Sequence, residues 1–377
     1  MDKLLNIDAT LSTPFLDQIK EQIRARIRDG DLLPGDKIPS IRQLSETTGV
    51  SIGIVQRAVG SLIQENYLRS HPGRGVFVSE SRLQNQNIAL VLPTCELEQM
   101  PRFVRGAKRQ LEGHTANLLV MSADSDFDQE IDMIDQLDKP FISGAVIYPP
   151  PFREVVPSLR ELRRRGIPFV LVNTMFEELQ ADAVVCDWHA VGRLMLEELL
   201  TCGHRRIGLV DLSQQTSASF TECRRGAREI LGEHGLDFKT LPSISGDAHA
   251  IDPEVPWGAS EKLARQLLRE NADLTAIAAF NDYLTLGVFR AAEQRHIPIP
   301  GQLSLVGISD LAVFKMCRPA VTVVDVRHEE MARLAVDRLL ALLADPSLAP
   351  VQKRLPPILR RRQSVTPPVD IGSSAAG

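Results

Sequence analysis

The feature of this 377-residue chain that most constrains its fold begins at Asn87, where short apolar runs start to alternate with amphipathic stretches. The apolar runs are IALVLP, LLVMSA, GAVIYPP, FVLVN, RIGLVDL, AIAAF and LSLVGI, and helical patterns follow them. Alternation of this kind predicts parallel sheets with helices on both faces. About ten such units exceed one sheet of ordinary size, so we expect an α/β fold with two lobes.

The first eighty residues follow a different pattern. A packing helix ended by Gly30 is predicted by apolar residues spaced four apart, at Phe15, Ile19, Ile23 and Ile27. A short helix is expected at residues 41–48, capped by Ser40, and a third helix follows Gly49, capped by Ser51. Two short helices around a tight turn are typical of a helix-turn-helix.

A β-hairpin is predicted after the third helix. The strand-like stretches 67–69 and 76–78 are joined by Ser-His-Pro-Gly-Arg-Gly, which gives the hairpin a basic, glycine-rich tip. The third helix should turn its apolar face inward, and that face consists of Ile54, Val55, Ala58, Val59, Leu62 and Ile63. Together these elements predict a winged helix-turn-helix in residues 1–80.

Composition and charge indicate the compartment in which the chain works, but they do not identify its partner. The net charge is −5, and residues 1–80 hold ten Lys and Arg against ten Asp and Glu, so charge alone does not indicate nucleic-acid binding. A DNA reader needs only a local basic face. The five cysteines are far apart and lack a C-x-x-C pair, which predicts buried apolar fillers in a reducing compartment. The opening residues have no apolar core, and no run approaches the roughly 18 to 20 residues that span a bilayer, so we expect a cytoplasmic protein without membrane contact.

The first segment resembles the GntR family of bacterial regulators. The resemblance rests on L-x-P-G-D-x-I-P-S-x-R-x-L at 32–44, G-V-S at 49–51 and G-R-G-V-F-V at 73–78. It implies that the third helix enters the major groove of double-stranded DNA and that the hairpin tip approaches the minor groove. The implied DNA-binding residues are Ser40, Arg42, Ser51, Ile52, Gly53, Gln56, Arg57, His71, Gly73 and Arg74. The alternative is that the arginines are ordinary solvated charges.

The larger segment resembles the sensor of the LacI/GalR regulators, which has the fold of periplasmic sugar-binding proteins. The resemblance rests on C-D-W-H-A-V-G-R at 186–193, G-H-R-R-I-G-L-V at 203–210, R-R-G-A at 224–227, and A-I-A-A-F-N-D-Y-L-T-L-G at 276–287. It continues through I-P-I-P-G-Q-L-S-L-V-G-I-S-D at 297–310 and V-T-V-V-D-V at 321–326. A GntR-type reader on such a sensor is similar to the arabinose-repressor arrangement.

These patterns also predict the domain boundaries. A polar linker at residues 81–86 is expected to join the reader to a sensor at 87–368, with a flexible tail at 369–377. Lobe 1 is expected at about 87–202 and 325–345, and lobe 2 at about 203–322 and 355–366.

The effector site is expected beyond the carboxyl ends of the strands, where ligands of open α/β sheets bind. The predicted residues are Thr94, Tyr148, Pro149, Asn173, Ser217, Phe220, Thr221, Asn281, Asp282, Ser309 and Asp310. Carboxylates and amides bind hydroxyl pairs, and an aromatic wall suits the apolar face of a sugar ring. Sugar-binding relatives have an Arg where this chain has Thr221 and an Asp where it has Ser309, so the effector need not be an ordinary monosaccharide.

Several of these residues also have a structural interpretation. Asn281 and Asp282 follow a strand and can cap the next helix, and Asp187 can cap another. The segment 203–206, Gly-His-Arg-Arg, is expected to end a helix and lead into a strand. His328 is either an exposed helix residue or a pocket residue.

The sequence predicts a regulator rather than an enzyme. It has no metal-ligand cluster, P-loop, G-x-S-x-G elbow or lysine motif for pyridoxal phosphate, so neither catalysis nor a cofactor is expected. We expect a homodimeric repressor that binds a DNA operator and is released by a small polyhydroxylated effector. The alternatives are an activator that senses a non-sugar metabolite and a solute-binding protein, which would need an export signal.

Overall fold

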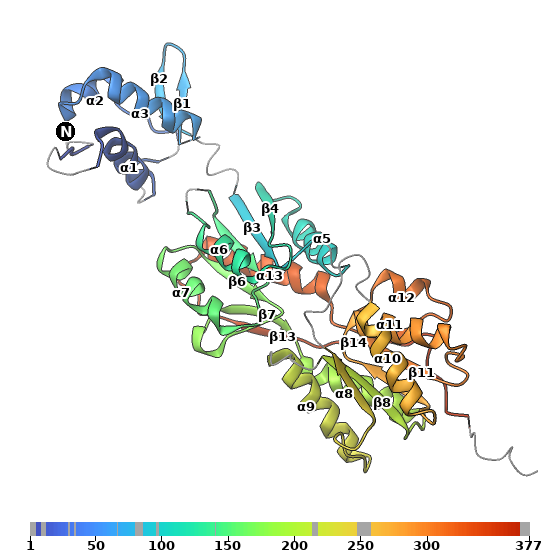
Figure 1. Cartoon of the computed structure of the whole chain (residues 1–377). Helices are drawn as coiled ribbons and strands as arrows, with labels where there is room; N and C mark the ends of the chain where they lie inside the picture. The colour runs from blue at the N-terminus through green and yellow to red at the C-terminus, as the bar shows by residue number, and fades with distance from the viewer. Residues whose placement is uncertain are drawn as a thin grey trace, which may run out of the picture. The chain divides into compact units, whose positions relative to one another are not determined.

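The computed structural model describes residues 5–8, 13–28, 31–33, 35–65, 67–79, 86–95, 98–139, 141–212, 218–246 and 258–369 (Figure 1). The chain divides into two compact units. The first comprises Met1–Asn87 with Gly113–Asn117, and the second comprises Ile88–Glu112 with Leu118–Gly377. Most of the expected linker lies outside the described residues, whereas Gln86 is already the first residue of a sensor strand.

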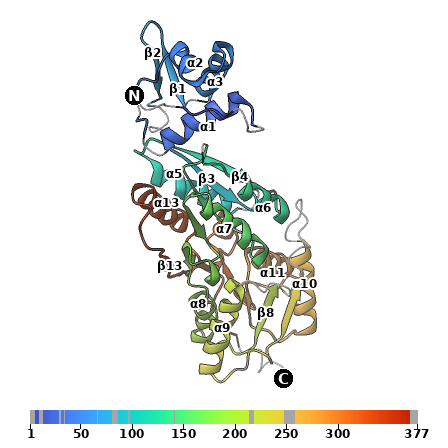
Figure 2. The same ribbon diagram turned by 90° about the vertical axis from the view of Figure 1, so that its left-hand side faces the viewer.

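The first unit is a winged helix (Figure 2). Its helices are α1 (Phe15–Arg28), α2 (Ile41–Thr48) and α3 (Ile52–Gln64), and its antiparallel hairpin consists of β1 (Leu68–His71) and β2 (Gly75–Val78). Ile19 and Ile23 of α1 are fully buried against Val55, Ala58, Val59 and Leu62 of α3 in one apolar cluster. The predicted stripe is wrong at Phe15, which is 37% exposed because it is the first residue of α1, and Leu16 packs against the core instead. Gly30 lies outside the described residues.

A half-buried carboxylate ties α1 to the end of α3. Glu65, at the end of α3, accepts from Lys20 Nζ at 2.7 Å and Arg24 Nη2 at 2.6 Å, both on α1. Burial opposes ionisation, but the hydrogen bonds from Lys20 and Arg24 prevail and lower the pKa of Glu65 to about 2. The pairing fixes α1 against α3, and it commits two basic side chains to stability rather than to a partner.

The second unit contains two six-stranded sheets. Lobe 1 has the strand order β13-β7-β6-β5-β3-β4, and lobe 2 has the order β14-β12-β11-β10-β8-β9. In lobe 1 the strands are β3 (Gln86–Leu92), β4 (Ala116–Ser122), β5 (Gly144–Ile147), β6 (Phe169–Val172), β7 (Asp182–Cys186) and β13 (Gln352–Leu355). In lobe 2 they are β8 (Ile207–Leu212), β9 (Ser243–Gly246), β10 (Ala276–Ala279), β11 (Ser304–Ile308), β12 (Thr322–Asp325) and β14 (Ile358–Arg360).

Helices cover these sheets. They are α5 (Met100–Leu111), α6 (Phe127–Asp135), α7 (Val156–Arg164), α8 (Trp188–Thr201), α9 (Ala218–Glu233), α10 (Gly258–Glu270), α11 (Asp282–Gln294), α12 (Ala312–Met316) and α13 (His328–Ala344). The predicted combination of a winged helix with a two-lobed α/β unit is confirmed. One strand departs from the parallel pattern, because β14 pairs antiparallel with β12 at the sheet edge. None of the described helices is long and apolar enough to cross a membrane.

The chain crosses from one lobe to the other at different points from those expected. Helix α8, predicted in lobe 1, packs against β10, β11 and β12 of lobe 2, so the first crossover lies after β7 rather than near residue 202. Strand β13 pairs with β7, which places residues 352–355 in lobe 1. The close packing of α8 against α9 explains the first difference, since a Cβ at Gly192 or Gly226 would lie 1.9 or 2.0 Å from a backbone oxygen of the partner helix.

The cysteines only partly follow the expectation. All five are free; Cys186 and Cys223 are buried, and Cys202 and Cys317 are half-buried. Cys95 is exposed, because it follows the end of β3 in a loop, and it is therefore not a core filler.

We predict that Glu65→Gln loosens the winged helix, because a neutral amide cannot satisfy two cations. Hydrogen–deuterium exchange of residues 15–28 and 52–64 in the full chain should become roughly 5- to 30-fold faster at pH 7. This corresponds to a loss of about 1 to 2 kcal/mol in the free energy of local opening, after allowance for solvent screening. A group whose pKa is lowered on folding stabilises the protein above its ordinary value of 4.5, so the difference should vanish as the pH falls toward 2. Glu46→Gln, at an exposed position of α2, serves as the control. Equal exchange in both variants would refute the role of Glu65.

Candidate functional site

The first candidate DNA-contacting element is the start of α2. Ser40 caps this helix, accepting from the Gln43 backbone N–H at 3.3 Å, while the Gln43 side chain accepts from the Ser40 N–H at 2.9 Å. This reciprocal capping box fixes where the helix begins. Arg42, in the first turn, is exposed and forms no ion pair with a described residue.

The second element is the first two turns of α3. Ser51, Gly53, Gln56 and Arg57 are exposed, and Ile52 is 51% exposed. Ser51 occupies the N-cap position, but the prediction of a capping side chain is wrong, because its hydroxyl makes no cap hydrogen bond. An exposed isoleucine beside polar residues is unusual for a packing helix. It suits a surface that contacts bases, where apolar groups meet thymine methyl groups.

The third element is the hairpin tip. Gly73 and Gly75 have φ of +73° and +117°, in the left-handed region that favours glycine. Arg74, between them, is exposed and forms no ion pair with a described residue. His71 is half-buried, with its ring 5.3 Å from that of Phe77. His71 therefore supports the hairpin, and the tip itself presents Arg74.

The effector site is best defined at the carboxyl ends of β5 and β6. Tyr148 follows β5 and Asn173 follows β6, and the Asn173 Nδ2 donates to the Tyr148 hydroxyl at 2.5 Å. Asn173 has φ of +65°, which turns the chain directly after the strand. From lobe 2, the Ser219 hydroxyl donates to the Asn173 carbonyl at 3.3 Å. The carboxyl edges of the two sheets therefore approach each other at Asn173.

Several buried polar atoms near these strand ends have no hydrogen-bond partner among the described residues. They are Gln99 Oε1, both carboxylate oxygens of Glu130, Asn173 Oδ1 and Trp188 Nε1. Glu130 is 0% exposed, and Asn173 is 9% exposed. Leaving such groups unsatisfied is costly, so each requires a partner such as a bound ligand, ion or water. They are the strongest indication that a polar ligand binds in this part of the molecule.

Aromatic rings accompany these atoms. The rings of Trp188 and Phe220 are stacked, 6.4 Å apart and 18° from parallel. Phe103 lies edge-on to Tyr148 at 5.4 Å and tilted to His328 at 5.2 Å. His328 is buried, and burial lowers the pKa of His328 to about 4. Of the two alternatives for His328, the structure therefore favours the interior.

Asn281 and Asp282 lie at the start of α11. The Asn281 side chain accepts from the backbone N–H groups of Tyr283 and Leu284 at 2.7 and 3.3 Å, so Asn281 caps this helix. Asp282 is 8% exposed, and burial raises the pKa of Asp282 to about 6.

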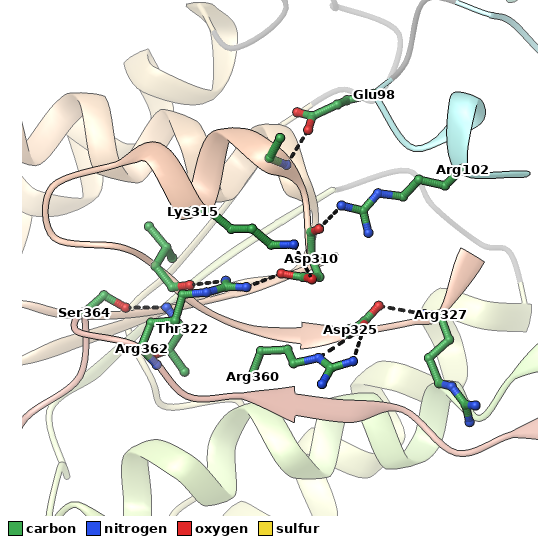
Figure 3. A network of polar contacts seen from close by, with 12 residues as sticks. Glu98, Arg102, Asp310, Lys315, Thr322, Asp325, Arg327, Arg360, Arg362 and Ser364 are labelled. Carbon is green, nitrogen blue, oxygen red and sulfur yellow. Dashed lines mark hydrogen bonds and ion pairs between the residues drawn. The ribbon is translucent and has the colours of Figure 1, made fainter. Parts of the chain in front are cut away.

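Ser309 and Asp310 follow β11, and Ser309 is buried with φ of +71°. Figure 3 shows that Asp310 belongs to an ionic network. Its carboxylate binds Arg362 and lies 2.9 Å from Lys315 Nζ, while Arg102 of lobe 1 donates to its backbone carbonyl. Burial works against the charge, but the hydrogen bonds from Lys315 and Arg362 lower the pKa of Asp310. The Asp310 side chain is thus held by basic residues of its own lobe, while its backbone carbonyl contacts lobe 1.

The other predicted residues are less informative. Thr94 and Pro149 are buried beside the ends of β3 and β5, whereas Thr221 is exposed on α9. Ser217 lies outside the described residues. The structural interpretations hold: Asp187 caps α8, accepting from the Ala190 N–H at 3.1 Å, and His204 is buried between Thr275 Oγ1 and the Thr366 carbonyl.

Sequence reasoning missed Gln99, Phe103, Glu130 and Trp188. Glu130 carried a detectable signal, because it precedes Ile134 by four positions and therefore shares the buried face of α6. Trp188 lies two residues after the end of β7 at Cys186, at the start of α8. Gln99 and Phe103 had no comparable signal, since only the packing of α5 brings them to the strand ends.

Both parts of the chain match known families. Residues 15–78 match the family described as bacterial regulatory proteins, gntR family, and residues 196–365 match the periplasmic binding protein-like domain. The arabinose metabolism transcriptional repressor of Geobacillus stearothermophilus is 24% identical over 340 residues, covering 88% of this chain and 92% of that repressor. The regulator GalR of Escherichia coli K12 is 26% identical over 343 residues, covering 87% and 96%.

Solved structures show the same fold. A LacI family regulator from Enterococcus faecium with bound ribose has a TM-score of 0.65 at 21% identity, covering 75% of this chain and 99% of that one. A complex of the regulator CelR with cellobiose has a TM-score of 0.64 at 20% identity, covering 94% and 100%.

The winged helix, its exposed arginines and the two-lobed unit define a DNA-binding transcriptional regulator. Within that class, the chain combines a region similar to the gntR family with a region similar to the periplasmic binding protein-like domain.

We predict an unusual pH dependence of stability from Glu130. Burial raises the pKa of Glu130 to about 8 from an ordinary value of 4.5, so the folded protein holds a proton that the unfolded chain releases between these values. Stability due to this group is present below pH 4.5 and falls as the pH rises toward 8, by at most about 1.4 kcal/mol per pH unit. Glu130→Gln should remove this decline.

Urea unfolding of the full chain, followed by tryptophan fluorescence between pH 5 and 8, measures the difference, since both tryptophans lie outside the winged helix. Glu161→Gln is the matched control, because Glu161 is a glutamate of the same lobe whose side chain is 41% exposed and already paired with Arg164. Parallel pH profiles for wild type and Glu130→Gln would contradict the prediction.

Proposed function

We propose that this chain is a homodimeric, cytoplasmic transcriptional repressor whose winged helix binds a two-fold DNA operator. A polyhydroxylated effector binds where the two lobes approach each other and releases the operator. The observation that carries the sensor part of this proposal is the group of buried, unpartnered polar atoms at the strand ends.

DNA binding through Arg42, Arg57 and Arg74 is supported by the contrast with other basic residues of the same unit. Lys20 and Arg24 are paired with Glu65, whereas these three guanidinium groups are exposed and form no ion pair with a described residue. They come from the three elements that a winged helix presents to DNA. When unpaired guanidinium groups bind phosphates, they displace the counterions condensed on the DNA, and the release of these counterions favours binding.

A homodimer is supported by the size of the reader. One short recognition helix and one hairpin tip make few contacts, and regulators of this kind gain affinity by binding two half-sites about one helical turn apart. Effector-driven rotation of the subunits would then move the two readers out of register with successive major grooves. The relatives named as repressors support repression as the outcome.

A sugar-like effector is supported by the chemistry of the site. Hydroxyl groups both donate and accept, so a polyol can satisfy Asn173 Oδ1 and Trp188 Nε1 at once. The stacked Trp188–Phe220 pair offers a surface to the apolar face of a ring. Relatives named for arabinose metabolism and structures with ribose or cellobiose agree with this class. All of these relatives are regulators, so we expect binding without catalysis.

We predict that Arg42→Ala weakens operator binding by about 1 to 3 kcal/mol, the range of a charge-assisted hydrogen bond. Fluorescence anisotropy with the DNA upstream of its own gene should also show a shallower dependence of affinity on salt. Arg26→Ala provides the control, because Arg26 lies on α1, outside the predicted DNA face. Unchanged affinity for Arg42→Ala would remove this residue from the interface.

We predict that Trp188→Phe raises the effector concentration needed to release the operator about 5- to 30-fold. The substitution keeps an aromatic ring beside Phe220 but removes the indole N–H, and one hydrogen bond to a ligand contributes about 1 to 2 kcal/mol. Titration of the operator complex with sugars and sugar acids measures the effect. The control is Phe141→Leu, which changes an exposed aromatic residue of lobe 1. If no polyhydroxylated compound releases the operator from the wild-type protein, the proposed function is wrong.

A further inference from the structure

We propose that Glu98 and Arg102 form a latch between the lobes and act as positioning residues for effector binding. Both lie in lobe 1, Glu98 just before α5 and Arg102 in its first turn. Their partners are backbone groups of the loop that joins β11 to α12 in lobe 2. The consequence for effector binding rests on the proposed function, whereas the latch itself does not.

The first support is a pair of hydrogen bonds that cross from one lobe to the other. Arg102 donates through Nη2 to the carbonyl oxygen of Asp310, and Glu98 Oε1 accepts from the Ala312 backbone N–H at 2.5 Å (Figure 3). A cationic donor thus meets a backbone acceptor, and an anionic acceptor meets a backbone donor. Because each bond includes a charged group, it is stronger than a bond between neutral partners.

The second support is that lobe 2 holds the receiving loop in place by itself. The Asp310 carboxylate lies 2.9 Å from Lys315 Nζ and binds Arg362, and Arg362 Nη1 also donates to the Val321 carbonyl at 2.7 Å. These partners all belong to lobe 2, so the loop needs no contact with lobe 1 to keep its shape. The carbonyl of Asp310 and the N–H of Ala312 therefore form a preformed catch.

The third support is that the latch depends on the arrangement of the lobes, whereas the chain crossovers do not. The chain passes between the lobes after β7, after β12 and between β13 and β14, and these covalent connections persist in every arrangement. The bonds of Glu98 and Arg102 exist only while the carboxyl edges of the two sheets lie together. The latch therefore stabilises the arrangement that encloses a ligand between the lobes.

A latch of this kind acts on ligand affinity without distinguishing ligands. The apparent affinity of a protein equals its intrinsic affinity multiplied by the fraction of molecules in the binding-competent arrangement. Loss of the latch lowers that fraction, so every ligand bound between the lobes is weakened by the same factor. A residue that contacts the ligand, in contrast, changes the preference for one ligand over another.

The first experiment tests the latch without a ligand. Hydrogen–deuterium exchange at the Ala312 amide is measured in the full chain, with fragmentation to resolve this position. Arg102→Ala leaves the Glu98–Ala312 bond intact, yet we expect exchange about 3- to 10-fold faster, because the lobes part more often. Arg105→Ala is the control, since Arg105 also lies on α5 but contacts Glu329 of its own lobe at 3.8 Å. Equal exchange in wild type and Arg102→Ala would overturn the latch.

The second experiment measures ligand binding by calorimetry with arabinose, ribose, glucose, galactose and cellobiose. Arg102→Ala and Glu98→Ala should each weaken the two tightest-binding sugars by one common factor of about 3- to 10-fold. Glu98→Gln, which keeps an acceptor oxygen, should weaken them less. The affinity for the operator without sugar should not fall in any of these variants.

A third variant removes the backbone donor itself. Ala312 is the first residue of α12, where proline is tolerated, and Leu311 has φ −73° and ψ 158°, which suits the residue before a proline. Ala312→Pro should reproduce the effect of Glu98→Ala, and the double variant should bind sugar no more weakly than either single variant. Ala312→Ser, which keeps the N–H, is the control.

The outcomes separate the latch from the proposed function. A variant of Glu98 or Arg102 that changes the ratio of the two sugar affinities would show contact with the ligand and overturn the latch. Additive effects of Glu98→Ala and Ala312→Pro would overturn the pairing of these two residues. If no sugar binds the wild-type chain, the proposed function fails, and the exchange experiment still decides whether the latch exists.

Discussion

Parallel strand pairing within the sensor places the candidate site. In a parallel sheet every connection must return to the starting edge through a crossover, so the carboxyl ends of all strands lie together. Tyr148 and Asn173 follow neighbouring strands of lobe 1 for this reason, and Asn281 and Ser309 follow neighbouring strands of lobe 2. Residues distant in the sequence thereby reach one region without any local signal that relates them.

The contact between the lobes uses the same edges. Arg102 of lobe 1 donates to the Asp310 carbonyl, and Glu98 accepts from the Ala312 backbone N–H in lobe 2. The Asp310 carboxylate in turn binds Arg362, which follows the last crossover of the chain. A ligand bound at Asn173 would lie beside the interlobe hydrogen bond that Ser219 donates to the Asn173 carbonyl, so its binding would bear on the arrangement of the lobes. Charge-assisted hydrogen bonds of this kind are strong enough to favour one arrangement over another.

Charged side chains in this protein divide into structural and available groups, and only the structure separates them. Arg24 and Arg42 count equally toward the charge of the winged helix, yet Arg24 is paired with Glu65 while Arg42 is exposed. The same holds for the acids: Asp310 is neutralised by Lys315 and Arg362, while the Glu130 carboxylate is buried without a hydrogen-bond partner among the residues that the structure describes. Formal net charge, −5 for this chain, could not have separated these groups.

The sequence by itself determined the secondary structure and the architecture, because both follow from local periodicity. The bounds of α2 and the hairpin follow from capping and turn residues, and the two α/β lobes follow from alternating apolar runs. Tertiary structure alone decided that α8 belongs to lobe 2. Gly192 and Gly226 allow α8 and α9 to pack closely, but neither glycine shows in the sequence which helix it will contact. It also decided the site. Glu130 carries a periodic signal of burial. Its lack of a hydrogen-bond partner among the described residues depends on how α6 packs, and no local pattern encodes that packing.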